Sequence, residues 1–211
     1  DIELKSPVYR YSDLNFVLLM DALEGMTGKH LNDYVETGVF EPIGAYNTMY
    51  TPKEKGVAES RIAPTERDPM LRRQLLRGFV HDELAAFSGG VQGNAGLFST
   101  AEDLAKLAQT WLQGGNYGGV EIFRKPTVAL FTRPSSKDGK GALGFDTSPA
   151  KCGLGSERTY GHTGFTGTQM KIDPDNGLIF IFLSNRVSPT RDNPAFTRSD
   201  IRNKLWAELY K

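Results

Sequence analysis

The fold of this chain is decided by the stretch GHTGFTGT, residues 161–168, in which three glycines and three threonines separate two strand-like segments. An ordinary hairpin places Asn-Gly or Asp-Gly at its tip. Here the small residues run along a strand and leave its backbone accessible. Accessible N–H groups on a strand edge can bind an oxyanion or a peptide-like ligand. A bulged, flexible hairpin explains the same residues equally well.

The last third of the chain has the alternation and turn chemistry of an antiparallel sheet. We expect strands over residues 143–146, 158–162, 168–173 and 178–184. The sequence DNG at 175–177 predicts a tight turn between the last two strands. Residues 178–183 are apolar on both faces, so this strand should be covered on both sides.

Helical periodicity dominates the rest of the chain. It predicts helices over residues 14–26 and 30–36, from 101 to the glycines at 114–115, from Pro126 to about 133, and over 197–210; residues 71–78 are a further candidate. Helices followed by a short antiparallel sheet and a terminal helix define an α+β fold. We expect one domain over 1–211, mainly helix and loop over 1–135, with strands and the C-terminal helix over 136–211.

The composition excludes several classes of function. The 25 basic and 25 acidic residues give zero net charge, which argues against a nucleic-acid or membrane-surface partner. The longest apolar run, residues 178–183, is too short to span a bilayer. A single cysteine excludes an internal disulfide, and the three histidines lack metal-ligand spacing, so neither metal nor cofactor is expected. The basic stretch 61–77 and the sequence VHDE at 80–83 are interpreted as solvated segments, although VHDE could lie at the rim of a cleft.

A second motif gives the glycine-rich stretch a chemical context. The sequence YSD at 11–13 precedes the first helix, where Ser12 or Asp13 could simply cap it. Together, YSD and the HTG at 162–164 resemble two of the three signatures of the serine β-lactamase and penicillin-binding-protein superfamily. The similarity is greatest to class C β-lactamases, DD-peptidases and related esterases. FEPIG at 40–44 and GNAGLFSTAEDL at 93–104 also resemble this family, so the likeness covers essentially the whole chain.

The resemblance implies a role for each residue of YSD and for the histidine of HTG. Tyr11 would be the phenolic acid/base, and its pKa of about 10 would have to be lowered by positive charge nearby. Asp13 would orient the motif and contact the substrate amide, while Ser12 would line the substrate site. His162 stands where many relatives have lysine; it could hydrogen-bond Tyr11 but need not be charged at neutral pH.

The rest of the glycine-rich stretch would form the wall of the cleft. In the resemblance, Thr163 and Gly164 line the strand edge along which substrate docks. The N–H of Phe165 would be one of the two oxyanion donors.

The chain departs from the family in the third signature, which is Ser-x-x-Lys at the start of a buried helix. The spacing occurs only in SPAK, residues 148–151, which we interpret as a chance match in a loop. We therefore expect the nucleophile helix, the lysine and the first strands of the sheet to lie upstream, outside this incomplete domain, and this chain alone to be inactive. The 178–184 strand should then have an edge that pairs with a separate segment or a second chain.

The resemblance implies a serine hydrolase that forms an acyl-enzyme with a D-alanyl amide of peptidoglycan, a β-lactam or a small ester. An esterase of the same fold is the alternative that His162 favours, and a non-catalytic binding module with a β-lactamase-like cleft is another. The same resemblance implies a periplasmic or cell-surface location.

Overall fold

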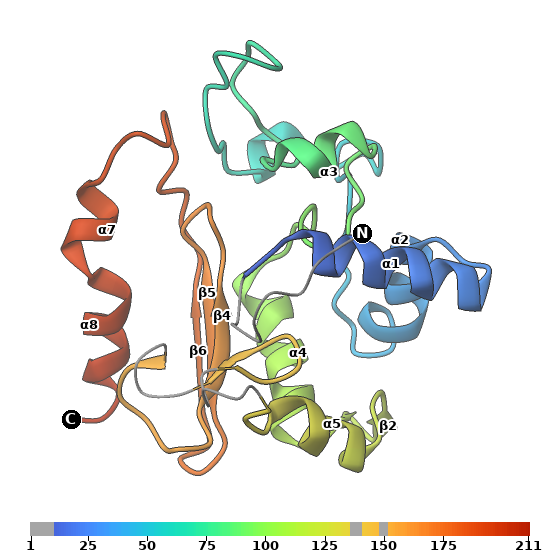
Figure 1. Cartoon of the computed structure of the whole chain (residues 1–211), viewed down its shortest axis with the longest axis vertical. Helices are drawn as coiled ribbons and strands as arrows, with labels where there is room; N and C mark the ends of the chain where they lie inside the picture. The colour runs from blue at the N-terminus through green and yellow to red at the C-terminus, as the bar shows by residue number, and fades with distance from the viewer. Residues whose placement is uncertain (1–10, 136–140, 148–151) are drawn as a thin grey trace, which may run out of the picture.

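A four-stranded antiparallel sheet forms the centre of the C-terminal half, as the computed structural model shows (Figure 1). The structure describes residues 11–135, 141–147 and 152–211. The strands are β3 (Asp146–Thr147), β4 (Tyr160–Thr163), β5 (Gln169–Asp173) and β6 (Leu178–Phe182), in the spatial order β3-β4-β5-β6. All four predicted strands exist, although the first is reduced to its last residue and the threonine that follows.

The pairing of β4 with β5 explains one glycine of the decisive stretch. Gly161 lies opposite Lys171 and His162 opposite Met170. A Cβ on Gly161 would come within 2.2 Å of the Met170 carbonyl oxygen, so a side chain at 161 would push the strands apart. The next hairpin closes at the predicted turn, with Asp173 opposite Leu178.

Helices cover both faces of the sheet, as the apolar sequence of β6 predicts (Figure 1). On one face lies α4 (Ala101–Leu112), which begins at Thr100, whose hydroxyl accepts a hydrogen bond from the Asp103 amide at 3.2 Å. Its Ala108 packs in a buried cluster with Tyr160 of β4. On the other face lies α8 (Ile201–Glu208), whose fully buried Trp206 has its ring 5.7 Å from that of Phe180.

The predicted C-terminal helix is in fact two helices. The first is α7 (Ala195–Ser199), and Asp200, with a φ of 51°, separates it from α8. A left-handed residue cannot continue a right-handed helix, so the chain changes direction at this point.

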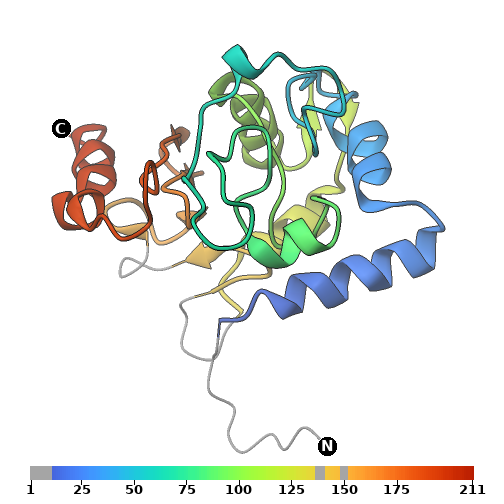
Figure 2. The same ribbon diagram turned by 90° about the horizontal axis from the view of Figure 1, so that it is seen from above.

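Residues 11–135 are built mainly from helices and loops, coloured from blue through green to olive in Figure 2. Helix α1 (Leu14–Thr27) agrees with the predicted range 14–26 and ends at Gly28, where φ is 65°. Helix α2 (Leu31–Val35) lies within the predicted range 30–36 and continues directly into the π-helix η1 (Glu36–Phe40). The remaining elements are η2 (Glu59–Arg61), α3 (Glu83–Phe87), β1 (Asn116–Tyr117), β2 (Val120–Glu121) and α5 (Lys125–Thr132).

The segment 71–78 is not helical, contrary to the sequence-based expectation. The carboxylate of Asp68 accepts hydrogen bonds from the amides of Met70, Leu71 and Arg72. These amides are then held in a turn, and Arg67 pairs with Leu75 across it. Within the described part of the chain, no helix combines the length and apolarity needed to cross a membrane.

Candidate active site

Tyr11 and His162 lie face to face although they are far apart in the sequence. Tyr11 immediately precedes α1, and His162 lies on β4; their rings are stacked with centroids 6.3 Å apart. The Tyr11 hydroxyl donates to Asp13 Oδ1 at 3.2 Å. Asp13 has helical backbone angles and makes no side-chain cap hydrogen bond. Asp13 is therefore the N-cap residue by position, but its carboxylate accepts a hydrogen bond from Tyr11 and does not cap the helix.

The hydrogen bond of His162 defines which of its nitrogens carries a proton. Nδ1 lies 2.8 Å from the Thr163 carbonyl oxygen. A carbonyl can only accept, so Nδ1 is the donor. In the neutral ring Nε2 is then an acceptor, able to receive a hydrogen bond or a proton. A lysine at this position would have presented only donors.

A cavity of about 210 Å³ opens beside the Tyr11–His162 pair. One side comes from Ser12, just before α1, and from Phe16 in its first turn; the other comes from residues 141–145 and from Asp146 of β3. Both rings of the pair contribute to the lining. The volume suits a small acyl group or one amino-acid side chain.

Among the described residues, the edge of β4 beyond His162 is unpaired on one side. Strand β3 pairs with β4 at Tyr160 and Gly161, whereas Thr163 pairs with Gln169 of β5. Gly164 then turns the chain: its N–H donates to Thr168 O at 2.8 Å, and its carbonyl accepts from Gly167 N at 3.0 Å. Within the described residues, no group accepts a hydrogen bond from the N–H of Phe165. Among the described residues, the Phe165 amide therefore has no acceptor and the end of β4 has no pairing strand on this side, and their roles in oxyanion and substrate binding stay predictions.

The structure brings only part of the expected site together. Tyr11, Ser12 and His162 line the cavity, whereas the Phe165 ring lies outside it and is 58% exposed. The sequence SPAK at 148–151 falls outside the described residues, so its interpretation as a loop remains a prediction. In the part of the chain that the structure describes, no three His, Cys, Asp or Glu side chains are grouped to hold a metal ion.

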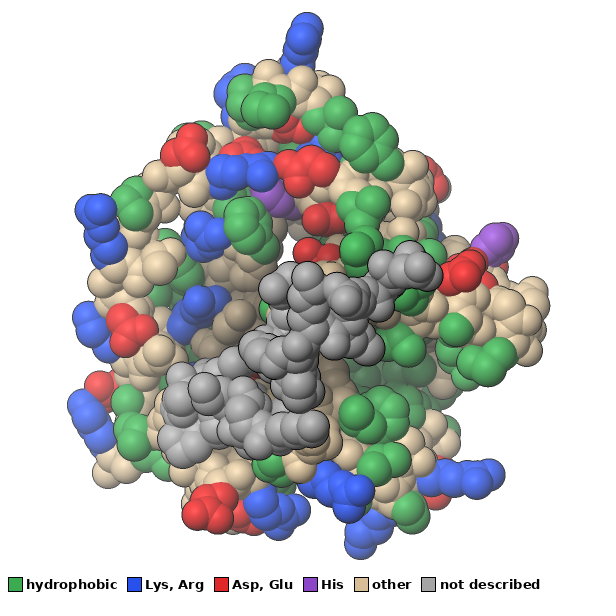
Figure 3. All heavy atoms as spheres, in the orientation of Figure 1, with side chains coloured by type: hydrophobic (Ala, Val, Ile, Leu, Met, Phe, Trp, Pro, Cys, Tyr) green, Lys and Arg blue, Asp and Glu red, His purple; other side chains and the backbone are tan. Residues whose placement is uncertain are grey.

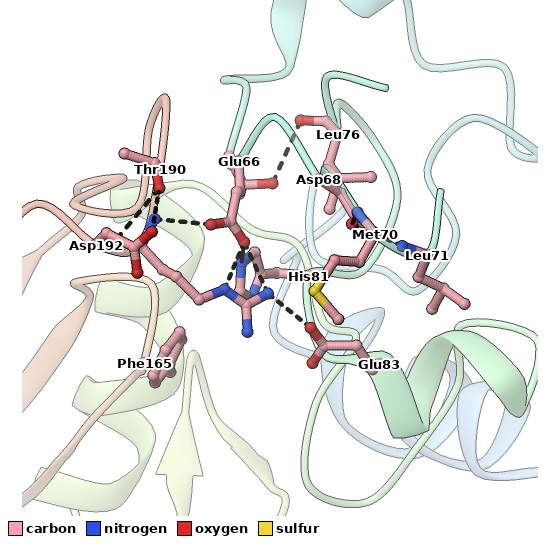
Figure 4. A network of polar contacts seen from close by, with 12 residues as sticks. Glu66, Asp68, Met70, Leu71, Leu76, His81, Glu83, Phe165, Thr190 and Asp192 are labelled. Carbon is pink, nitrogen blue, oxygen red and sulfur yellow. Dashed lines mark hydrogen bonds and ion pairs between the residues drawn. The ribbon is translucent and has the colours of Figure 1, made fainter. Parts of the chain in front are cut away.

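A buried polar network beside the site was missed by the sequence analysis (Figure 4). His81 is only 8% exposed, and its Nε2 lies 2.8 Å from Glu66 Oε2. The same carboxylate accepts from the amide and Nε of Arg191, at 2.7 and 2.8 Å. Arg191 also donates to Glu83 at 2.6 Å. The interpretation of VHDE as a solvated turn is therefore wrong for its histidine.

The interpretation of the basic stretch 61–77 as solvated also fails at one residue. Arg72 has a side chain only 14% exposed, and it donates to Asp68 and to the carbonyls of Val80 and His81. Arg72 therefore holds the backbone at Val80 and His81 through their carbonyl oxygens.

The network sets the charge of Glu66. Burial alone would raise the pKa of this carboxyl, but hydrogen bonds from Arg191 and His81 outweigh burial and lower the pKa to about 2. Glu66 is therefore a carboxylate at neutral pH.

Comparison with solved structures places the fold among β-lactamases and penicillin-binding proteins. The chain superposes on a β-lactamase from Mycobacterium bovis with a TM-score of 0.56 and 20% identity, over 90% of this chain and 62% of that chain. It superposes on a penicillin-binding-protein homologue from Pyrococcus abyssi with a TM-score of 0.62 and 16% identity, over 92% and 46%. Simvastatin synthase from Aspergillus terreus gives 0.63 and 16%, over 90% and 52%. At such identities the likeness concerns the fold alone.

Sequence comparison identifies the family. The Beta-lactamase family model matches residues 6–201, so the chain belongs to the β-lactamase family. A relative from Escherichia coli K12, named "Putative D-alanyl-D-alanine carboxypeptidase", is 42% identical over 200 residues, and one of the same name from Salmonella typhi is 42% identical over 201. The alignments cover 86% and 87% of this chain but 46% of each relative, so the chain spans about half their length. The predicted α+β, β-lactamase-like fold and its incompleteness are confirmed.

Proposed function

We propose that the protein containing this chain is a serine hydrolase that transfers acyl groups through an acyl-enzyme. The observation that carries the proposal is the Tyr11–His162 pair beside a cavity and an open strand edge. In this mechanism Tyr11 moves a proton between nucleophile and leaving group, and Asp13 orients the phenol. The Nε2 atom of His162 can accept the proton that Tyr11 transfers. The β4 edge binds the substrate backbone, and the Phe165 N–H stabilises the oxyanion.

The substrate class that we propose is a D-alanyl amide of peptidoglycan. Its support is the printed name of the 42% identical relatives and the open strand edge, which suits an extended peptide. A small ester is the second candidate, favoured by His162, because a neutral imidazole attracts a substrate carboxylate less than a lysine does. The expected periplasmic or cell-surface location accompanies the peptidoglycan substrate and stays a prediction.

The nucleophile, in this proposal, is supplied by a Ser-x-x-Lys segment outside the chain. The full-length protein should then be labelled stoichiometrically by a fluorescent penicillin, whereas the purified 211-residue chain should not be labelled. Gel fluorescence after a short incubation measures both. Stoichiometric labelling of the chain alone would overturn the assignment of the nucleophile. Failure of the full-length protein to react with penicillin, a D-Ala-D-Ala peptide and a nitrophenyl ester would instead favour the non-catalytic binding module.

The outer edge of β6 is proposed to pair with a further segment of the protein or with a second chain. Within the described residues, β6 is hydrogen-bonded to β5 only, and it lies at the edge of the sheet. The β6 amides that do not bond to β5 should exchange hydrogen slowly in the full-length protein and quickly in the isolated chain. Hydrogen exchange with mass spectrometry compares the two. Equally fast exchange in both would show an uncovered edge, and protection that depends on protein concentration would identify a second chain as the partner.

A further inference from the structure

Phe165 is held in place from outside the sheet. Strand β4 ends at Thr163, and Phe165 is 58% exposed as a residue, so neither strand pairing nor burial fixes it. Its ring instead stacks on His81, with centroids 5.6 Å apart and planes inclined by 27°. Two guanidinium groups also contact the Phe165 ring: that of Arg186 lies 4.5 Å from the ring centroid, and that of Arg191 lies 5.8 Å from it.

The two peptide groups that flank the Phe165 Cα atom are also fixed. The first contains the Phe165 N–H, and its carbonyl, that of Gly164, accepts from Gly167 N at 3.0 Å. The second carries the Phe165 carbonyl, which accepts from Arg186 Nε at 2.6 Å. Because a peptide group is planar, binding its oxygen also fixes the direction of its N–H. The direction of the Phe165 N–H therefore depends on the contacts that hold the Gly164–Phe165 turn.

His81 is the least movable of these contacts. The other two groups against the ring are arginines on flexible stems, whereas His81 is 8% exposed and is hydrogen-bonded to a Glu66 that is 2% exposed. Glu66 is in turn held by the backbone and side chain of Arg191. In Figure 4 the side chains of Glu66 and His81 converge near the centre of the network, and the Phe165 ring lies below them. The network thus links the loop before α3 to the turn after β4.

We propose that His81 is a positioning residue: anchored by Glu66, its ring stacks on Phe165 and holds the Phe165 N–H in the direction that oxyanion binding requires. This inference rests on the proposed function, which assigns the oxyanion role to that amide. His81 does not touch the reacting atoms and acts only through Phe165. This positioning role explains why His81, with its buried carboxylate partner, lies near the candidate site but outside its cavity.

Two substitutions of His81 in the full-length protein separate stacking from hydrogen bonding. His81→Gln keeps a donor for Glu66 but removes the ring, and His81→Phe keeps a ring over Phe165 but removes the donor. We expect His81→Gln to lower kcat for a chromogenic cephalosporin or a nitrophenyl ester by about tenfold or more with little change in KM, because misplacement of a transition-state contact affects kcat. We expect His81→Phe to retain kcat within about twofold while its melting temperature falls, because it leaves a buried carboxylate with one donor fewer. Wild-type kcat in His81→Gln, or losses in both variants that follow their melting temperatures, would overturn the proposal.

A spectroscopic readout separates failure of this proposal from failure of the proposed function. With selective ¹⁵N-phenylalanine labelling, the Phe165 amide resonance is assigned by its loss in Phe165→Leu. It should shift in His81→Gln and stay near its wild-type position in His81→Phe. If the protein proves to lack acyl-transfer activity but the shifts follow this pattern, the proposed function fails while the coupling of His81 to Phe165 stands. An unshifted Phe165 amide in His81→Gln would refute the coupling itself.

Discussion

Replacing Tyr11 by phenylalanine should lower the acyl-transfer rate of the full-length protein by about a hundredfold or more. The substitution keeps the ring that stacks on His162 and removes only the hydroxyl that donates to Asp13. Proton transfer by a positioned group contributes about 10²–10⁴ to a rate, so loss of the hydroxyl removes the whole of this contribution. Steady-state hydrolysis of a chromogenic cephalosporin, a D-Ala-D-Ala peptide and a nitrophenyl ester measures the effect and ranks the substrates at the same time.

Tyr46 offers a matched control for this experiment. It is 72% exposed and does not line the cavity, so Tyr46→Phe makes the same chemical change away from the candidate site. The control should keep the wild-type rate, and both variants should keep the wild-type circular dichroism spectrum. An unchanged rate in Tyr11→Phe would remove Tyr11 from the mechanism and leave its stack with His162 as a structural contact.

Local chemistry made much of the fold predictable. The β5–β6 hairpin follows from an Asn-Gly turn, and α4 follows from the hydroxyl of Thr100 three residues before an acidic side chain. These signals act within a few residues and need no tertiary partner. The break at Asp200 could not be predicted in this way, because it depends on one residue adopting a left-handed conformation inside an apolar periodicity that continues through it.

Only those residues of the candidate site that belong to a recognisable sequence motif could be predicted. Tyr11 and His162 were paired by resemblance to a family, since no local pattern relates residues so far apart in the sequence. His81 and Glu66 carry no comparable signal: both are polar residues of a kind usually found at the surface, and Arg191, which binds Glu66, is 125 residues from it in the sequence. A buried ion network forms from side chains that individually resemble surface residues, so composition and periodicity do not reveal it. The charge distribution at the surface is closer to what composition indicates. On the face drawn in Figure 3, basic and acidic side chains are interspersed, in keeping with a net charge of zero.

The same network predicts how stability depends on pH. The Glu66 carboxyl has its pKa lowered from 4.5 to about 2 in the folded protein, so the folded state binds this proton more weakly than the unfolded chain does. The carboxylate therefore contributes stability that is complete above about pH 4.5 and is lost as the pH falls toward 2. A difference of this size corresponds to about 3 kcal/mol. Other carboxyls with lowered pKa values, such as Asp173, act in the same range, so the contribution of Glu66 must be isolated by substitution.

Glu66→Gln should therefore lower the free energy of unfolding by about 3 kcal/mol at pH 7, because the buried side chain loses the negative charge that accepts hydrogen bonds from Arg191 and His81. The difference from wild type should shrink as the pH falls below 4.5 and nearly vanish near pH 2, where wild-type Glu66 is becoming protonated. Urea unfolding of both proteins at several pH values measures this convergence. Glu59→Gln is the matched control, since Glu59 pairs with Lys53 at the surface with 58% of its side chain exposed, and its loss should change stability far less than the loss of Glu66 does. A Glu66→Gln difference that stays constant from pH 7 to 2 would mean that packing of the side chain, and not its charge, stabilises the network.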